Sequence, residues 1–254
     1  GDINAITKTY FEDKNALNPL DATQNGQSQF NEQLVFEMTD AYRKKQGKFF
    51  DKYEKALSGV DTINLSAEEK ISYHIIEWEC KIGKELLKQP ANLMPVHQFW
   101  GTHLVMGQLA GGTGAQPFKT EKDYTNFLKR MDKYAVWIDS AMVYMKKGIK
   151  QGAVLPKALT IKMIPQFAEM PTPKIEDNLF YSAIKLMPNT FSEAIKKDLT
   201  AKYTATIKDK LIPQYKKMTD FLKNEYLPAS RTTSGIGSLA FGKELYAAYA
   251  KAYT

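Results

Sequence analysis

The chain has 254 residues, of which 43% are hydrophobic and 25% charged, proportions that are typical of a globular protein and exclude a disordered or fibrous one. No apolar run is long enough to cross a bilayer, and the single cysteine, Cys80, excludes an internal disulfide. The formal net charge is +7, but lysines alternate with acidic residues and form no arginine-rich or aromatic patch. We therefore expect no nucleic-acid partner.

Helical spacing of apolar residues dominates the first part of the chain. It predicts a helix over residues 3–17, which the dipeptide Asn18-Pro19 ends because the residue before a proline avoids helical geometry. A second helix is predicted over residues 30–57 and a third over residues 66–87. The third helix begins with Ser66 and Glu69, whose spacing is that of a capping box, and its predicted inward residues are Ile71, Ile75, Trp78 and Ile82.

Residues 90–119 form the longest irregular stretch, with a short helix expected near residues 101–109. The next segment is a long amphipathic helix over residues 120–150, opened by a second capping box at Thr120 and Asp123. One face of it carries the apolar residues Tyr124, Leu128, Met131, Tyr134, Ile138, Met142, Met145 and Ile149. Glycines and a proline then end the helix at Gly148, Gly152 and Pro156.

The last third of the chain predicts two more helices and at most one very short β piece. A helix over residues 156–169 is disturbed by Pro165. The longest apolar run spans residues 191–222 and follows a third capping box, expected at Thr190 and Glu193. Pro213 lacks a backbone donor, so we predict a kink there. The only strand candidate is the segment 235–239.

These patterns predict an all-α protein, in which several helices pack in layers and one long helix is kinked. No internal repeat and no change in composition marks a boundary along the chain. We therefore expect residues 1–254 to form a single helical domain.

The order of these features resembles a bacterial family known as domain of unknown function 885. The family pattern has a glutamine and glycine block, then a helix led by tyrosine and a glycine and proline exit. The matching residues here are Gln98, Gly101, Tyr124, Phe127, Leu128, Arg130, Gly148, Ile149, Gly152 and Pro156. Segments 178–188 and 226–246 resemble two later blocks of the family, although Met131 and Ala240 replace its usual leucine and proline.

Full members of that family are about twice as long and resemble zinc metallopeptidases of the gluzincin kind. Their zinc motif, an HE…GH arrangement on a helix, lies in the second half. The resemblance therefore implies that this chain is the N-terminal half of a longer protein and that zinc is expected only in the missing C-terminal half. Because many members carry export signals, it also implies an exported protein, periplasmic or an outer-membrane lipoprotein after signal removal.

The residues themselves offer no zinc motif. A zinc-peptidase helix needs two histidines one turn apart, together with a glutamate that acts as a base. The chain has only His74, His97 and His103. The last two are six residues apart, on different sides of a helix, and Trp78 occupies the place where an inverted motif starting at His74 needs its second histidine. We expect no catalytic residue, metal ligand or cofactor in this chain.

Two features could bind a ligand. The glycines of the irregular stretch match no phosphate-binding motif, because Thr113 stands where the lysine should be; this stretch is either a tightly packed turn or the lining of a cleft. Arg231 lies in a polar turn of a lysine-rich chain. It could bind a peptide carboxylate with its planar fork or pair with an acidic residue at a helix end. The candidate cleft or substrate contacts are Gln98, Trp100, His103, Arg231 and Tyr246.

Two functions remain open from the sequence. In the first, the chain is the cleft-forming half of a metallopeptidase-like hydrolase that acts on a peptide or small-molecule substrate and is inactive without its other half. In the second, it is a non-catalytic helical binding or scaffold protein of the cell envelope. A final helix after Gly242 would expose an apolar face and could form a homo-oligomer; this face comprises Leu239, Phe241, Leu245, Tyr246, Tyr249 and Tyr253.

Overall fold

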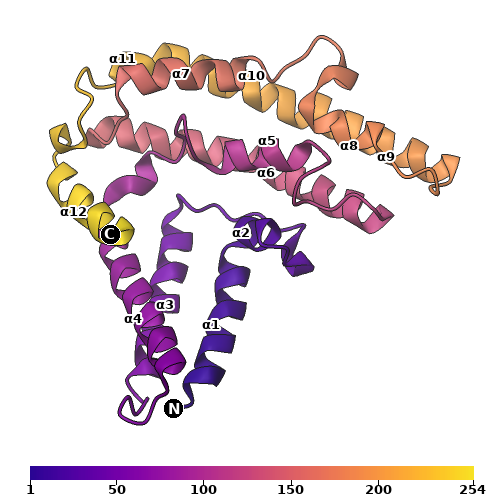
Figure 1. The fold of residues 1–254 in the computed structure, drawn as a ribbon. Coiled ribbons are helices and arrows are strands. Elements are labelled where there is room, and N and C mark those ends of the chain that lie inside the picture. The colour runs from indigo at the N-terminus through magenta and orange to yellow at the C-terminus, as the bar shows by residue number, and fades with distance from the viewer.

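The structure, a computed structural model, describes all 254 residues and contains helices in layers with no sheet (Figure 1). The all-α prediction is confirmed. The central layer holds α5 (Thr102–Ala110) and the long α6 (Glu121–Gln151). Above it lie α7 (Lys157–Ala168), α8 (Ser182–Lys185), α9 (Glu193–Thr206), α10 (Ile212–Phe221) and α11 (Leu227–Ala229).

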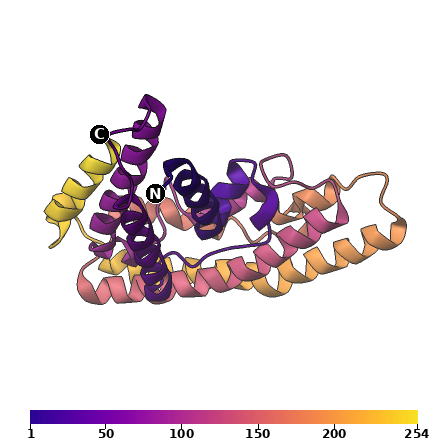
Figure 2. The same cartoon turned by 90° about the horizontal axis from the view of Figure 1, so that it is seen from below.

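The N-terminal helices form an arm that projects from these layers (Figure 1). Its three helices pack against one another: α1 (Ile3–Leu17), α3 (Asp40–Leu57) and α4 (Ala67–Leu87). Seen from below, α3 and α4 lie across the long helices, and the short α2 (Pro19–Gln24) leads from the arm to the layers (Figure 2). The C-terminal α12 (Gly242–Tyr253) returns to the arm and packs on α4.

Helix α6 organises the main core because it is buried on most of its circumference. Both halves of the capping box at Thr120 and Asp123 form, and the left-handed Gly152 (φ 72°) ends the helix as predicted. Trp137 and Tyr134 are fully buried, and the Tyr134 hydroxyl lies 3.0 Å from that of Tyr215 on α10. The arm has its own, smaller core, separate from the cluster around α6.

The long C-terminal run is interrupted by two wide π turns, each two residues before a proline. The turn Ile207–Leu211 precedes Pro213, and Leu222–Tyr226 precedes Pro228. A proline ring collides with the carbonyl four residues earlier, which in both cases lies inside the π turn. At Pro213, where a kink was predicted, the structure has a π turn in the hydrogen-bond ladder, and the sequence analysis missed the second turn before Pro228.

Helix α3 begins ten residues later than predicted. Residues 31–39 are turns, and the Thr39 side chain caps the helix by accepting from the backbone N–H of Tyr42. The carbonyls of Phe30 and Gln33 accept hydrogen bonds from Arg130 on α6. These bonds from a distant side chain hold the segment before α3 in its non-helical conformation.

Helix α4 has its predicted bounds and capping box, but of the four residues predicted to face inward only Ile82 is buried. Ile71 is 60% exposed, Ile75 52% and Trp78 43%, whereas Ile76 and Cys80 are buried in the core of the arm. The apolar stripe named from the sequence therefore faces outward over much of its length.

Two predictions near the C-terminus are also corrected. Segment 235–239 contains a 3₁₀ turn, Ile236–Ser238, and the one β bridge in the structure pairs Pro156 with Arg231. The third capping box fails, because Ser192 rather than the residue at position 190 caps α9.

The apolar face expected on the last helix is largely covered by the protein itself. Leu239 and Leu245 are buried, and only Tyr246 and Tyr253 are well exposed. The surface on which the predicted homo-oligomer depended is therefore reduced to two tyrosines. No helix in the structure combines the length and the apolar character that a membrane span requires.

Candidate functional site

An apolar pocket of about 290 Å³ lies where the turn after α11 meets α7, α12 and the segment before α5. Arg231 is the one charged residue that lines it. Its walls are mostly apolar and aromatic, and include Met94, His97, Trp100, Leu155, Leu159, Ile236, Leu239, Leu245 and Tyr249. An apolar pocket with one well-placed polar group is the usual form of a small-ligand site. We call it the arginine pocket.

Arg231 is held in this pocket by neutral oxygens only. Its backbone pairs with Leu155 and Lys157, and its Nε donates to the Val154 carbonyl at 3.1 Å. Its Nη1 donates to three oxygens of the turn 233–238. The guanidinium forms no ion pair with a carboxylate, and its Nη2 makes no hydrogen bond with the protein. The alternative that Arg231 pairs with an acidic residue at a helix end is therefore wrong.

The structure brings two of the five candidate contacts, Arg231 and Trp100, into the arginine pocket. The exposed Trp100 ring stacks on the buried His97 ring, with centroids 3.5 Å apart. Burial lowers the pKa of His97, which favours the neutral imidazole.

The other three candidates lie outside the arginine pocket. His103 is only 6% exposed and stacks on Phe167, and burial lowers its pKa to about 4. Its Nε2 lies 3.4 Å from the side-chain oxygen of Gln166, whose amide donates to the Gln98 carbonyl. Gln166 thus connects Gln98 with His103, and neither of the two lines the pocket. Tyr246 is 64% exposed on α12 and does not line the pocket.

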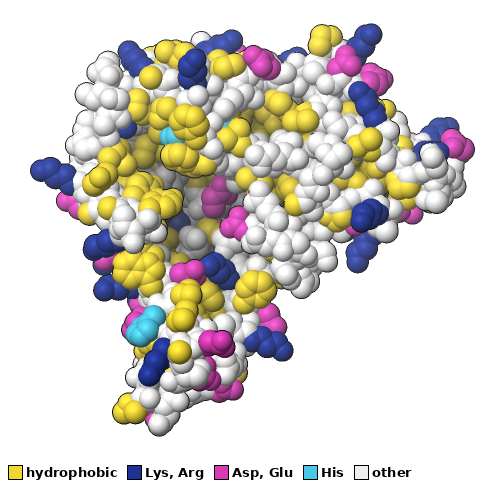
Figure 3. Space-filling model, in the orientation of Figure 1, with side chains coloured by type: hydrophobic (Ala, Val, Ile, Leu, Met, Phe, Trp, Pro, Cys, Tyr) yellow, Lys and Arg dark blue, Asp and Glu magenta, His cyan; other side chains and the backbone are white.

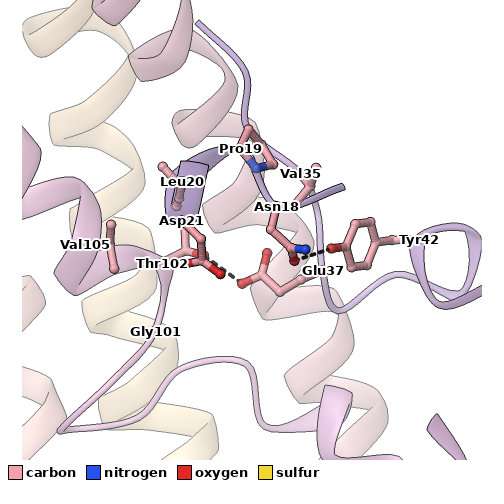
Figure 4. Close-up of a pocket in the computed structure, with 10 residues that line it drawn as sticks. All are labelled: Asn18, Pro19, Leu20, Asp21, Val35, Glu37, Tyr42, Gly101, Thr102 and Val105. Carbon is pink, nitrogen blue, oxygen red and sulfur yellow. Dashed lines mark hydrogen bonds between the residues drawn. The ribbon is translucent and has the colours of Figure 1, made fainter. Parts of the chain in front are cut away.

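A second pocket, of about 260 Å³, has a carboxylate, Glu37, at its centre (Figure 4). Glu37 comes from the turn just before α3, Thr102 from the start of α5, and Asn18 and Asp21 from the beginning of α2. The sequence analysis did not identify this pocket, because it assigned residue 37 to a helix. We call it the glutamate pocket.

Neutral donors alone hold the Glu37 side chain. Its Oε1 accepts from the Thr102 hydroxyl and its Oε2 from the Trp137 indole, each at 2.8 Å. No lysine or arginine forms an ion pair with it. Burial raises the pKa of Glu37, with the hydrogen bonds opposing the shift. A carboxyl group with a perturbed pKa in a cavity marks a candidate functional site.

The two pockets are linked by the segment 97–102. In this segment His97 and Trp100 line the arginine pocket, and the last two residues, Gly101 and Thr102, line the glutamate pocket. Gly101 has φ 133°, and a Cβ there would lie 2.9 Å from Nδ1 of His103. Glycine is therefore required where this segment turns. Figure 3 shows the surface hollowed between the arm and the layers, with acidic side chains in the hollow.

The family model described as "Bacterial protein of unknown function (DUF885)" matches residues 19–254. The chain belongs to the DUF885 family. The matched range contains both pockets, apart from Asn18 at the edge of the glutamate pocket. A comparison with curated proteins finds no match.

Among solved structures, this DUF885 chain is similar to the crystal structure of a "putative lipoprotein" from Colwellia psychrerythraea. The TM-score is 0.76 at 15% sequence identity, which shows a shared fold. The match covers 96% of this chain and 44% of the other, so the chain spans less than half the length of that protein.

The residues of this DUF885 chain do not fit a zinc centre. No group of three or more histidine, cysteine, aspartate or glutamate side chains is placed to hold a metal ion. His74 lies on the exposed side of α4, where its Nδ1 contacts Glu77, while His97 lines the arginine pocket and His103 stacks on Phe167. A protein zinc site takes at least three such ligands, so no step of a reaction is assigned to a metal here.

Proposed function

We propose that this chain is the substrate-binding half of a metallopeptidase-like hydrolase and that the arginine pocket binds a carboxylate of a peptide or small-molecule substrate. The observation that supports this is Arg231. Its guanidinium lies in an apolar pocket, has no acidic partner and retains an unused Nη2. A ligand carboxylate would supply the missing negative charge and accept from that nitrogen.

The hydrolytic part of the proposal concerns residues outside this chain. The similar protein from Colwellia psychrerythraea is more than twice the length of the part that this chain covers. In our proposal the longer protein holds the zinc and the activated water, since peptide hydrolysis needs such a nucleophile. The chain alone then hydrolyses no peptide. We also propose that the protein is exported to the cell envelope, as a lipoprotein would be.

Carboxylate binding can be tested with paired ligands. Dipeptides with an aromatic C-terminal residue are titrated as free acids and as amides, and tryptophan fluorescence is followed in a Trp78→Phe background. The two remaining tryptophans are Trp100, which lines the pocket, and Trp137, which is fully buried and does not line it. We expect the acid to bind about ten times more tightly than the amide, which corresponds to one charge-assisted hydrogen bond of about 1.4 kcal/mol.

Variants of Arg231 show whether the preference arises in this pocket. Arg231→Ala should abolish the preference for the acid, and Arg231→Lys should retain part of it through charge alone. Tyr246→Ala, outside the pocket, serves as the control and should keep the full preference. Equal binding of acid and amide by the wild-type chain would contradict the proposal. The hydrolytic part is tested separately, by elemental analysis and a peptide-library assay on this chain and on the longer protein.

The second function, a non-catalytic helical binding or scaffold protein of the cell envelope, is favoured by the outward stripe on α4. Ile71, Ile75 and Trp78 form an exposed apolar row, a type of surface that commonly mediates protein contacts. A longer protein that lacks zinc and hydrolyses no peptide would support this function over the first.

A further inference from the structure

No lysine or arginine contacts the Glu37 carboxyl group. It is enclosed by protein on most sides, and its two hydrogen bonds come from a hydroxyl and an indole. A buried charge is normally paired, because leaving water costs several kcal/mol. Thr102 donates to one oxygen and Trp137 to the other, so each oxygen retains capacity to accept a further hydrogen bond, and Glu37 lines the cavity.

The cavity in front of Glu37 has the character that complements a cation. No lysine or arginine lines it, although the chain has a net charge of +7. A second carboxylate, Asp21, stands at its exposed edge and forms no ion pair. Apart from these carboxylates the lining is mixed: Pro19, Leu20, Val35 and Val105 are apolar, while Asn18, Tyr42 and Thr102 are polar but uncharged. Figure 4 shows the Glu37 side chain among these residues.

We propose that the glutamate pocket binds an organic ammonium group carried on a short alkyl stem. The ammonium donates hydrogen bonds to the Glu37 carboxylate, the stem lies against Val35 and Val105, and Asp21 attracts the cation at the entrance. This inference does not depend on the carboxylate site around Arg231, since it concerns a different pocket.

The chemistry of the pocket favours an amine over a metal ion. Calcium takes six to eight oxygen ligands, and magnesium requires an octahedron of them. This pocket offers one deep carboxylate that already accepts two hydrogen bonds, and no group of three acidic or histidine side chains converges there. Its apolar side chains would give nothing to a hydrated metal ion but would remove an alkyl stem from water.

The test uses the indole of Trp137, which donates directly to Glu37, as a local probe. The ¹⁵N-labelled chain is titrated with 1,5-diaminopentane and with N-acetyl-lysine methylamide, which distinguish a free amine from a lysine side chain. We expect a saturable shift of the Trp137 Nε1–H resonance with at least one of them. The indole signals are assigned with Trp78→Phe and Trp100→Phe, which leave the core intact because both residues are exposed.

Three variants locate the binding. Glu37→Gln keeps the fold, because its amide can accept from Trp137 and donate to Thr102; it should weaken amine binding at least tenfold. Val105→Phe fills the cavity without touching the carboxylate and should weaken binding equally. Asp40→Asn, on the exposed start of α3 outside the pocket, should leave it unchanged.

Several results would overturn the inference. One is amine binding of equal strength by Glu37→Gln and wild type. Others are an equal shift with 1-pentanol, which lacks the charge, and a saturable response to calcium or magnesium but not to the amines. The absence of any saturable shift with either amine would also refute it.

Discussion

Arg130 and Arg231 are both held only by neutral oxygens, yet one is enclosed and the other is open. Arg130, on α6, is fully buried, and its three nitrogens donate to five oxygens contributed by residues 19–33 and Gln116. Burial lowers its pKa to about 10, so it remains charged at neutral pH. Arg231, at the edge of its pocket, leaves Nη2 unused.

The difference shows how to separate a structural arginine from a binding one. Around Arg130 each of the three guanidinium nitrogens has at least one oxygen acceptor, and two of these acceptors are carbonyls of the turn segment that precedes α3. Around Arg231 the acceptors belong to Val154 and the turn 233–238, Nη2 has none, and the residue lines a cavity. Exposure and the number of satisfied N–H groups therefore distinguish the two, whereas the absence of a carboxylate partner does not.

The largest expected effect is on Arg130. Arg130→Met leaves the carbonyl of Gln33 and the buried side-chain oxygen of Gln116 without their donor, and it removes one of the two hydrogen bonds to the carbonyl of Phe30. We expect the free energy of unfolding to fall by about 3–5 kcal/mol, measured by urea denaturation. Arg130→Lys keeps the charge but not the planar fork, and should lose less. A loss below about 1 kcal/mol in the methionine variant would show that the guanidinium is not needed to hold the segment.

A second prediction tests whether the surroundings of His103 exclude water as well as the surroundings of Arg130 do. Burial lowers the pKa of His103 from its ordinary 6.5 to about 4. The unfolded chain then binds more protons between these values, so stability is present above pH 6.5 and is lost as the pH falls towards 4. The expected loss from this residue is about 3 kcal/mol.

The measurement compares the free energy of unfolding at pH 7 and pH 4. His103→Gln should show a decrease between these pH values that is smaller than the wild type's by about 3 kcal/mol. His74→Gln, at an exposed position on α4, is the control and should behave like the wild type. Identical profiles for all three proteins would mean that His103 titrates in contact with water.

A third prediction concerns Arg231 itself. Its hydrogen bonds organise the turn 233–238, but the turn is mostly exposed and water can replace the lost donors. Arg231→Ala should therefore lower the free energy of unfolding by only about 1–2 kcal/mol, less than the change at Arg130, although it abolishes the preference for a carboxylate. A loss as large as that of Arg130→Met would make Arg231 primarily structural.

Much of the fold was predictable because local signals fix it. The bounds of α1, α4 and α6 follow from Asn18-Pro19 and from two capping boxes, each of which acts within a few residues. The inward face of α4 was missed because apolar residues occur on two sides of the helix. A signal was available: Gly83 lies on the same side as Ile76 and Cys80, and a Cβ there would collide with the ring of Phe50 on α3.

The candidate site was predictable only in part. Arg231 stood out as an arginine in a polar turn, and it lies in a pocket together with Trp100. Glu37 gave no local signal, since its role depends on Trp137, 100 residues away. The late start of α3 has the same cause, because Arg130 bonds carbonyls about 100 residues away. Contacts of this range leave no periodic pattern in a sequence.

The smallest expected effects come from a matched pair of hydroxyl deletions, one beside each arginine. Thr23 is 1% exposed; its hydroxyl accepts from Arg130 and donates to Asn31. Ser238 is exposed, and its hydroxyl accepts from Arg231. Thr23→Val should cost about 1–2 kcal/mol of unfolding free energy, because a buried N–H and a buried amide oxygen lose their partner.

Ser238→Ala should cost less than about 0.5 kcal/mol, because water reaches the site and the carbonyl of Gly235 still accepts from Arg231. Both changes remove one hydroxyl. The difference between the two losses of unfolding free energy, measured by urea denaturation, therefore reports how far each arginine is shielded from water. Equal losses would mean that the turn 233–238 excludes water as well as the core does. The unused Nη2 of Arg231 would then need a partner from the protein, and the contrast between a closed and an open arginine would fail.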